Sequence, residues 1–289
     1  MRIGAHVPVA GGLLNACEYA VETGCECLQV FAKSPRQWQA GHREAADTAA
    51  FTAECARLGL GPVFTHAAYL INLGSDDPYL WERSCDAMAD ELVRGAQLDV
   101  AGVVVHAGTT YAGVNATPAG RVAEAVGRAW RIAAEQCAPP RLLLENSAGA
   151  GRSFGCTVED LCEAASGARD TGADVGICFD TCHGFAAGID VSTSEGWNHV
   201  CGAVEATLGM EALRLIHAND CNGELGSHRD RHAWIGEGAI GRGGFAAMFA
   251  ESRLAAASVV LEMPGDPPEK DRLNIEVLRV LRGGGGAPA

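Results

Sequence analysis

The stretch "GICFDTCHGFAAG", residues 176–188, is an apolar run that leads into three chemically active side chains. Asp180, Cys182 and His183 supply a carboxylate, a thiol and an imidazole within four positions. A short continuous apolar run bounded by turn residues is typical of a strand buried on both faces, where each polar residue needs a specific reason. The stretch therefore predicts a buried strand with a site at its carboxyl end.

Seven further apolar runs resemble this one: "RIGAHV" (2–7), "CLQVFA" (27–32), "PVFTHA" (62–67), "GVVVHAG" (102–108), "RLLLENS" (141–147), "LRLIHAND" (213–220) and "SVVLEMP" (258–264). Segments with helical periodicity lie between them, such as "AADTAAFTAECARLG" (45–59) and "PEKDRLNIEVLRVLRG" (268–283). Alternating strands and helices predict parallel strands joined by right-handed crossovers. Eight such units in about 250 residues favour a single closed (β/α)8 TIM barrel over a doubly wound open sheet, with the active site at the carboxyl-terminal mouth.

Length and composition are consistent with one large domain. The chain has 289 residues, of which 48% are apolar, so it can bury one sizeable core. We expect the barrel domain to span residues 1–282 and the glycine-rich end, residues 283–289, to be a disordered tail. The sequence has neither a secretory h-region nor a long uncharged apolar stretch, so we expect a cytoplasmic protein with no membrane partner. Its twelve cysteines include no CxxC pair and are interpreted mostly as buried thiols.

Polar residues end seven of the eight predicted strands, on the side that leads into the next helix. They are His6, His66, His106, Glu145, Asp180, His217 and Glu262. A single such residue is more often a turn cap or a partner of a backbone group. Because barrel strands all end at one mouth, however, seven of them indicate a common site. His183 joins them from an expected strand-to-loop turn, and Asp230 and His232 from a loop in which one residue separates them.

Leaving His6 aside, the candidates comprise five imidazoles and four carboxylates. A cluster of imidazoles and carboxylates this dense implies bound cations. Without cations, like charges would repel one another and some of the groups would change their protonation state. Nine ligands are too many for one tetrahedral ion and suit two or three ions that share carboxylates. Histidine-rich ligation favours zinc, while manganese or iron stays open. A formal net charge of −14 is atypical of a protein that coats nucleic acid, although bound divalent cations can reverse the local field.

Four longer motifs contain all the candidate ligands except His106 and Glu262: "THAAYLINLG" (65–74), "LLLENSAGAG" (142–151), "FDTCHGFAAGID" (179–190) and "HANDCNGELGSHRDRHAWIGEGAIG" (217–241). Together they resemble the endonuclease IV family of apurinic/apyrimidinic endonucleases, and the resemblance spans nearly the whole chain. It implies a barrel with three zinc ions and nine ligands. One ion would be held by His66, His106 and Glu145, a second by Glu145, Asp180, His217 and Glu262, and the third by His183, Asp230 and His232. By the same resemblance, Cys182 would serve packing and His6 would support the ligands.

The resemblance also implies an activity. We expect a metal-dependent phosphodiester hydrolase of the deoxyribonuclease IV type that acts in base excision repair. It would cut double-stranded DNA 5′ to an abasic site and trim blocked 3′ ends, and Glu145, as bridging ligand, would position the hydroxide. The residues expected to contact bent DNA from the mouth loops are Arg36, Gln37, Trp38, Tyr69, Leu70 and Arg229. A monomer is expected because DNA must reach the open mouth.

Two other functions stay open. A divalent-metal sugar isomerase or epimerase of the related barrel type would have a closed pocket and a site dominated by carboxylates. The third ligand cluster and the loops around Arg36 and Tyr69 argue against it. A zinc-stabilised DNA-damage binder would bind abasic DNA without cutting it, and the complete ligand set argues against that function.

Overall fold

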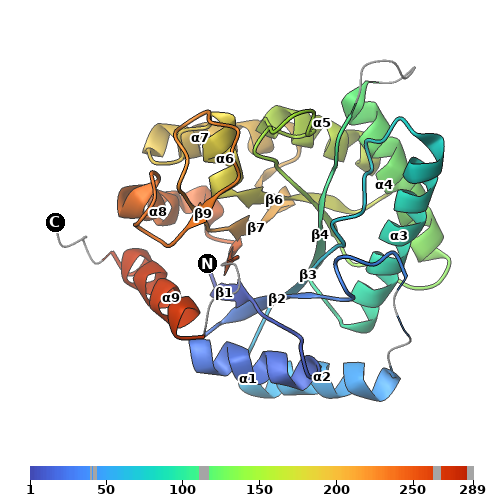
Figure 1. Cartoon of the computed structure of the whole chain (residues 1–289), viewed down its shortest axis with the longest axis horizontal. Coiled ribbons are helices and arrows are strands. Elements are labelled where there is room, and N and C mark those ends of the chain that lie inside the picture. Colours follow the sequence, from blue (N-terminus) through green and yellow to red (C-terminus); the bar gives the residue numbers. More distant parts are fainter. Residues whose placement is uncertain (40, 42–43, 111–116, 263–267, 285–289) are drawn as a thin grey trace.

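The computed structural model describes residues 1–39, 41, 44–110, 117–262 and 268–284. Eight parallel strands close into a barrel in the order β1, β10, β7, β6, β5, β4, β3, β2 (Figure 1). Their bounds are Ile3–His6 (β1), Cys27–Phe31 (β2), Val63–His66 (β3), Gly102–His106 (β4), Leu142–Glu145 (β5), Val175–Asp180 (β6), Leu213–His217 (β7) and Ser258–Leu261 (β10). The predicted TIM barrel is therefore confirmed, with one barrel strand in each of the eight apolar runs.

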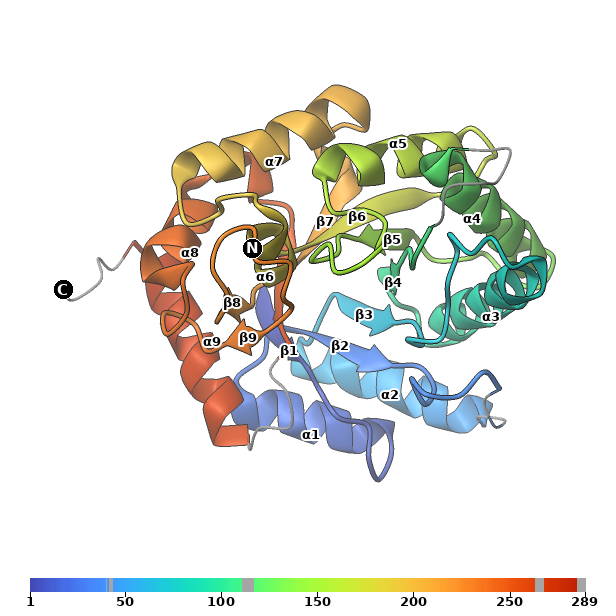
Figure 2. The same cartoon turned by 45° about the horizontal axis from the view of Figure 1, so that its top comes forward.

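Helices surround this barrel (Figure 2). They are α1 (Leu13–Thr23), α2 (Ala45–Leu58), α3 (Pro78–Gln97), α4 (Pro118–Ala134), α5 (Val158–Arg169), α6 (Thr181–Ala187), α7 (Ser194–Thr207), α8 (Gly241–Ala250) and α9 (Pro268–Arg282). Two 3-10 turns, Met210–Ala212 and Ser252–Leu254, precede β7 and β10. None of the helices in the described part of the chain combines the length and apolar character needed to cross a bilayer. Helix α9 ends where we expect the domain to end, and residues 285–289 of the expected tail lie outside the described residues.

Local sequence sets the helix ends. Thr117, Thr157 and Thr193 each precede a helix, and each hydroxyl accepts a hydrogen bond from a backbone N–H in the first turn. Such caps satisfy donors that have no partner inside the helix. Gly24 and Gly59 end α1 and α2 in the left-handed conformation, which glycine adopts without steric cost. These residues set where α4, α5 and α7 begin and where α1 and α2 end.

The barrel interior is filled by a separate cluster of buried side chains, one from each of seven strands. They are Cys27, Phe64, Val104, Leu143, Cys178, Leu215 and Val260. The eighth strand contributes Gly4, where a Cβ atom would lie 1.7 Å from the carbonyl oxygen of Cys27. Only glycine fits there, since β1 and β2 approach too closely for a side chain. This layer forms the floor on which the site is built.

Candidate metal centre

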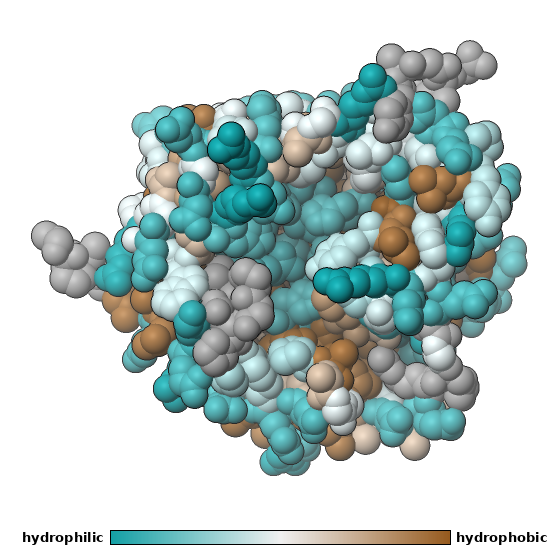
Figure 3. Space-filling view, viewed as in Figure 1, coloured by the Kyte–Doolittle hydropathy of each residue, from teal (hydrophilic) through white to brown (hydrophobic). Residues whose placement is uncertain are grey.

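The candidate ligands on the strands lie two positions beyond the interior layer. Side chains of a strand point to the same face at every second residue, so the residue two positions after each interior side chain also faces the barrel axis, nearer the mouth. By this relation the eight strands present His6, Gln29, His66, His106, Glu145, Asp180, His217 and Glu262. Figure 3 shows a hollow at the centre of this face, lined by hydrophilic residues.

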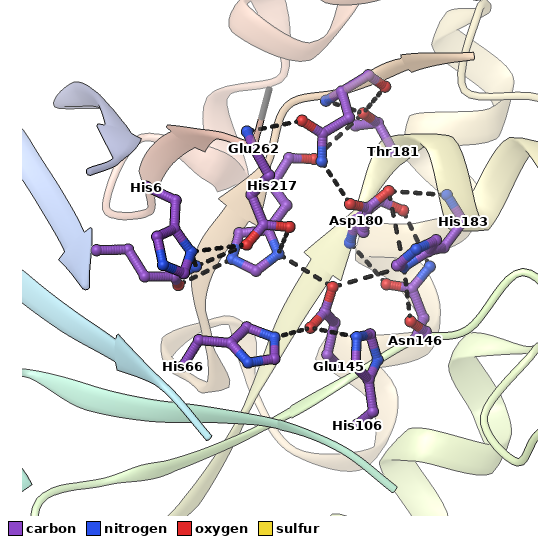
Figure 4. A network of polar contacts seen from close by, with 12 residues as sticks. His6, His66, His106, Glu145, Asn146, Asp180, Thr181, His183, His217 and Glu262 are labelled. Carbon is purple, nitrogen blue, oxygen red and sulfur yellow. Dashed lines mark hydrogen bonds and ion pairs between the residues drawn. The ribbon is translucent and has the colours of Figure 1, made fainter. Parts of the chain in front are cut away.

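Glu145 lies at the centre of the cluster and is fully buried (Figure 4). Its Oε2 atom lies 3.1 Å from His66 Nε2 and 3.4 Å from His106 Nε2. Its Oε1 atom lies 3.0 Å from His217 Nδ1 and 3.5 Å from His183 Nδ1. Oε2 therefore faces two predicted ligands of the first ion and Oε1 faces His217 of the second, as a bridging carboxylate requires.

The structure brings the predicted ligands of the first two ions together. The ligand atoms of His66, His106 and Glu145 lie within 4.8 Å of one another. Those of Glu145, Asp180, His217 and Glu262 meet the same limit. Both sets have the composition inferred from the resemblance. Their role as metal ligands remains a prediction.

The third predicted set meets only through Asp230. The groups within the 4.8 Å limit here are instead Asp180 with His183 and His232, and Cys182 with Asp230 and His232. Asp230 lies with Oδ2 3.3 Å from His183 Nε2 and with Oδ1 3.2 Å from His232 Nε2. Asp180 approaches the same two imidazoles, because its Oδ1 lies 3.8 Å from His183 Nδ1 and its Oδ2 lies 3.8 Å from His232 Nε2. Asp180 thus stands between the second and third sets.

His183 is placed by a helix, and the expected strand-to-loop turn is wrong. Asp180 ends β6 and caps α6, which begins at the next residue, and its Oδ1 accepts a hydrogen bond from the backbone N–H of His183 at 2.8 Å. An Asp cap followed by helix leaves no room for a loop. His183 therefore projects from the first turn of α6 with its backbone fixed by Asp180.

His232 is placed by a small hairpin that the sequence analysis missed. The run 213–220 contains one barrel strand that ends at His217 and the start of a second strand, β8 (Asp220–Cys221), which pairs antiparallel with β9 (His232–Ala233). The buried Asp220 carboxylate accepts backbone N–H bonds from Gly236, Gly238, Ile240 and Gly241. These bonds fold the chain after β9 back onto β8.

Burial and neighbouring charges shift the pKa values of the histidines and carboxylates in the cluster. Burial alone lowers the pKa of His66, but the hydrogen bond and charge of Glu145 outweigh it and raise that pKa to about 9. For His232, burial is likewise outweighed by Asp230 and Asp180, which raise its pKa to about 9. Burial raises the pKa of Glu145, but the charges of His106 and His217 hold it well below its usual range. Glu145 is therefore ionised at neutral pH, and a bound cation would displace protons from His66 and His232.

The orientation of the imidazoles fits metal ions. In each of four histidines one ring nitrogen faces an oxygen that is not a predicted ligand atom. These contacts are His66 Nδ1 to Ala67 O (2.8 Å), His183 Nδ1 to Asn146 O (3.1 Å), His232 Nδ1 to the backbone O of Glu262 (3.0 Å) and His217 Nε2 to Gln29 Oε1 (3.0 Å). That nitrogen donates, so the other ring nitrogen is directed into the cluster, as in histidines that bind metals. His232 Nε2 is buried and, although Asp230 Oδ1 lies 3.2 Å away, it makes no hydrogen bond to any of the described residues. The donor set thus suits zinc, manganese or iron.

Several supporting residues were missed in the sequence. Gln29 is fully buried, accepts from His217, and donates from Nε2 to Glu262 Oε1 at 2.7 Å. Asn219 donates to Asp180 Oδ2 at 2.6 Å, and Asn146 holds the backbone of Asp180 at both N and O. His6 contacts Glu262 at 3.3 Å, as expected of a supporting residue. Gln29 could have been found, because it stands at the layer in which the other strands carry ligands.

Cys182 is fully buried, and its thiol pairs with that of Cys221. Its sulfur also lies within 4.8 Å of ligand atoms of Asp230 and His232. The hydrogen bond to Cys221 and burial raise its pKa, which opposes the thiolate that a metal requires. These contacts favour the expected packing role.

The residues expected to contact DNA lie on loops after β2 and β3 and before β9. Arg36, Gln37 and Arg229 are exposed, and Trp38 and Leu70 are half-buried. Tyr69 is 62% exposed, and its ring lies edge-on to Phe31 with centroids 5.5 Å apart. These loops are joined, because the backbone N–H of Tyr69 donates to Pro35 O at 3.1 Å. The structure thus groups Arg36 and Tyr69 beside the cluster and leaves Arg229 on the loop that carries Asp230.

Comparison with known proteins places this architecture in a family. A profile described as xylose isomerase-like TIM barrel matches residues 17–282. A protein of Methanoculleus marisnigri named probable endonuclease 4 is 38% identical over 281 residues, which is 97% of this chain and 99% of that protein. The crystal structure of endonuclease IV from Thermus thermophilus superposes with a TM-score of 0.86 at 36% identity, over 98% of this chain and 100% of that one. A D-tagatose 3-epimerase-like protein, with a TM-score of 0.72, 17% identity and coverage of 99% of this chain and 98% of that one, shares the fold alone. The chain therefore belongs to the endonuclease IV family.

Proposed function

We propose that this protein is a zinc-dependent apurinic/apyrimidinic endonuclease that hydrolyses DNA 5′ to an abasic site, trims blocked 3′ ends and serves base excision repair. One observation carries the proposal: the nine histidine and carboxylate side chains predicted as ligands gather at one barrel mouth in an endonuclease IV sequence, beside exposed loops that bear Arg36 and Tyr69. We further propose that it acts as a cytoplasmic monomer with one domain over residues 1–282, since duplex DNA must reach the open mouth.

The ligand sets assign three zinc ions as inferred from the sequence. Glu145 would bridge the first ion, with His66 and His106, to the second, with Asp180, His217 and Glu262. His183, Asp230 and His232 would hold the third. When bound, the ions would supply Lewis-acid chemistry that polarises a phosphate and makes a nucleophile available near neutral pH.

The chain's own residues prepare this chemistry. Glu145 stays ionised because the charges of His106 and His217 lower its pKa against the effect of burial, so both oxygens remain acceptors and can orient an attacking group. Four carboxylates against three divalent cations leave a net charge of about +2 at the site. This local positive charge can attract one phosphodiester in a protein whose net charge is −14.

Access to the cluster supports a polymeric substrate. A cavity of about 250 Å³ is lined by His106, His183 and Asp230 and also by Ser147 and Ser153. The exposed Arg36 and Arg229 could contact phosphates on either side of the reacting one. Tyr69 and Leu70 would enter the gap left by a missing base, which is the least costly nucleotide to extrude because its stacking is already lost.

The test is incision of a labelled duplex that contains one tetrahydrofuran abasic analogue. The zinc-loaded wild type should make a single cut 5′ to the analogue, and Glu145→Gln should lose it. Binding without a cut would support a damage binder, and epimerisation of a ketose with manganese in place of incision would support the sugar-enzyme alternative. Either result overturns the proposal.

A further inference from the structure

We propose that Lys33 and Glu91 form a buried ion pair that fixes the two DNA-contacting loops relative to one another. The first loop comprises residues 32–38, after β2, and the second residues 67–74, after β3. The inference rests on the proposed function, because the loops are taken to meet DNA. Lys33 and Glu91 act here as positioning residues and touch no reacting atom.

Lys33 ties the first loop to α3. Its ammonium group lies 2.8 Å from Asp90 Oδ2 and 3.5 Å from Glu91 Oε1. It also donates to Trp38 O at 3.4 Å, so it holds both ends of the segment that carries Arg36 and Gln37. Its side chain is only 2% exposed, which is rare for lysine without paired charges.

Glu91 ties the second loop to the same point. It is fully buried on α3, and its Oε1 accepts a hydrogen bond from the backbone N–H of Ala68 at 3.0 Å. Ala68 directly precedes Tyr69, whose backbone N–H donates to Pro35 O in the first loop. One carboxylate oxygen therefore receives contacts from both loops.

The pair is poorly explained by stability alone. Burying two charges costs more than burying apolar side chains of the same volume, so a buried pair contributes little net stability. Glu91 Oε2 has no hydrogen-bond partner among the described residues, although a pair selected for stability would satisfy both oxygens. The arrangement instead makes the position of each loop depend on the other.

The experiment compares Lys33→Met, Lys33→Arg and the double variant Lys33→Met/Glu91→Leu with wild type. Leu278→Ala, a core substitution on α9, serves as a control that destabilises the fold away from both loops. Steady-state incision of the tetrahydrofuran duplex gives KM and kcat, thermal unfolding gives stability, and hydrogen exchange reports on the amides of residues 32–38 and 67–74.

We expect Lys33→Met to raise KM about tenfold with kcat nearly unchanged. This is the pattern expected when a variant loses DNA-binding contacts that stabilise the bound substrate and the transition state equally. Exchange should rise in the second loop too, although Lys33 bonds no atom of it. The double variant, which leaves no unpaired buried charge, should recover stability without recovering KM. Lys33→Arg, which keeps the positive charge, should show stability and KM close to those of the wild type.

Three results would overturn the inference: a rise in KM that Leu278→Ala reproduces, recovery of KM in the double variant, or faster exchange in the first loop only. If the wild type does not cut the duplex, the proposed function fails, and the exchange pattern still decides whether the pair couples the loops.

Discussion

Replacing Gln29 with leucine tests whether the cluster depends on partners behind its ligands. Glu262 can only accept hydrogen bonds when ionised, so the Gln29 amide nitrogen must face it, at 2.7 Å. The amide oxygen then faces His217 Nε2 at 3.0 Å, and that nitrogen must donate. Gln29 thereby fixes the tautomer in which His217 Nδ1 presents its lone pair to the second metal site. Leucine has a similar volume and can do neither.

The magnitude follows from the two lost hydrogen bonds. Removing such an outer partner weakens metal binding about 10- to 100-fold, or about 1.4–2.7 kcal/mol. We therefore expect Gln29→Leu to bind its most weakly held zinc 10- to 100-fold less tightly in competition with a fluorescent chelator. Asn198, an exposed polar residue, gives a matched control in Asn198→Leu. A folded Gln29→Leu protein with wild-type zinc affinity would refute the reasoning.

Three further predictions concern protons, damage recognition and the hairpin. Since the pKa values of His66 and His232 are raised to about 9, both imidazoles are protonated near pH 7. Zinc binding at that pH should therefore release protons. Zinc affinity should rise with pH up to about 9 and then level off. Calorimetry in buffers of different ionisation enthalpy measures this, and affinity independent of pH from about 6 to 9 would contradict it. Tyr69→Ala should weaken binding to the abasic duplex about tenfold, with little change for intact duplex, and equal losses in fluorescence anisotropy would exclude a role in recognition. Asp220→Ala removes the acceptor of one buried and several part-buried N–H groups and should lower the free energy of unfolding by about 3 kcal/mol or more in urea denaturation. A change below about 1 kcal/mol would show that water replaces the carboxylate.

The barrel could be predicted because each of its strands is a short apolar run that stands out between helical segments. The ligands could be predicted for a related reason. A histidine or carboxylate at the end of a doubly buried strand, such as His66 or Glu145, conflicts with its surroundings unless it serves a site. Because such residues recur at the ends of most of the predicted strands, the sequence indicates a common site.

Other parts of the site depend on contacts that local sequence does not report. The seven-residue helix α6 is too short for a clear periodic signal, although Asp180 followed by Thr-Cys-His is compatible with an N-cap. Gln29 lies inside an apolar run, and its role is visible only once the register of the interior layer is known. The contact between Lys33 and Glu91 joins residues on different units of the barrel, which no local pattern encodes.

Zinc titration of metal-free protein decides whether the cluster works as a metal-dependent phosphodiesterase. Bound zinc and the rate of incision of the tetrahydrofuran duplex are measured on the same samples. We predict that incision appears as zinc approaches about three ions per chain, and that Glu145→Gln never reaches it. Incision that survives complete removal of metal, or full zinc occupancy without incision, would show that the cluster is not a metal-dependent phosphodiesterase.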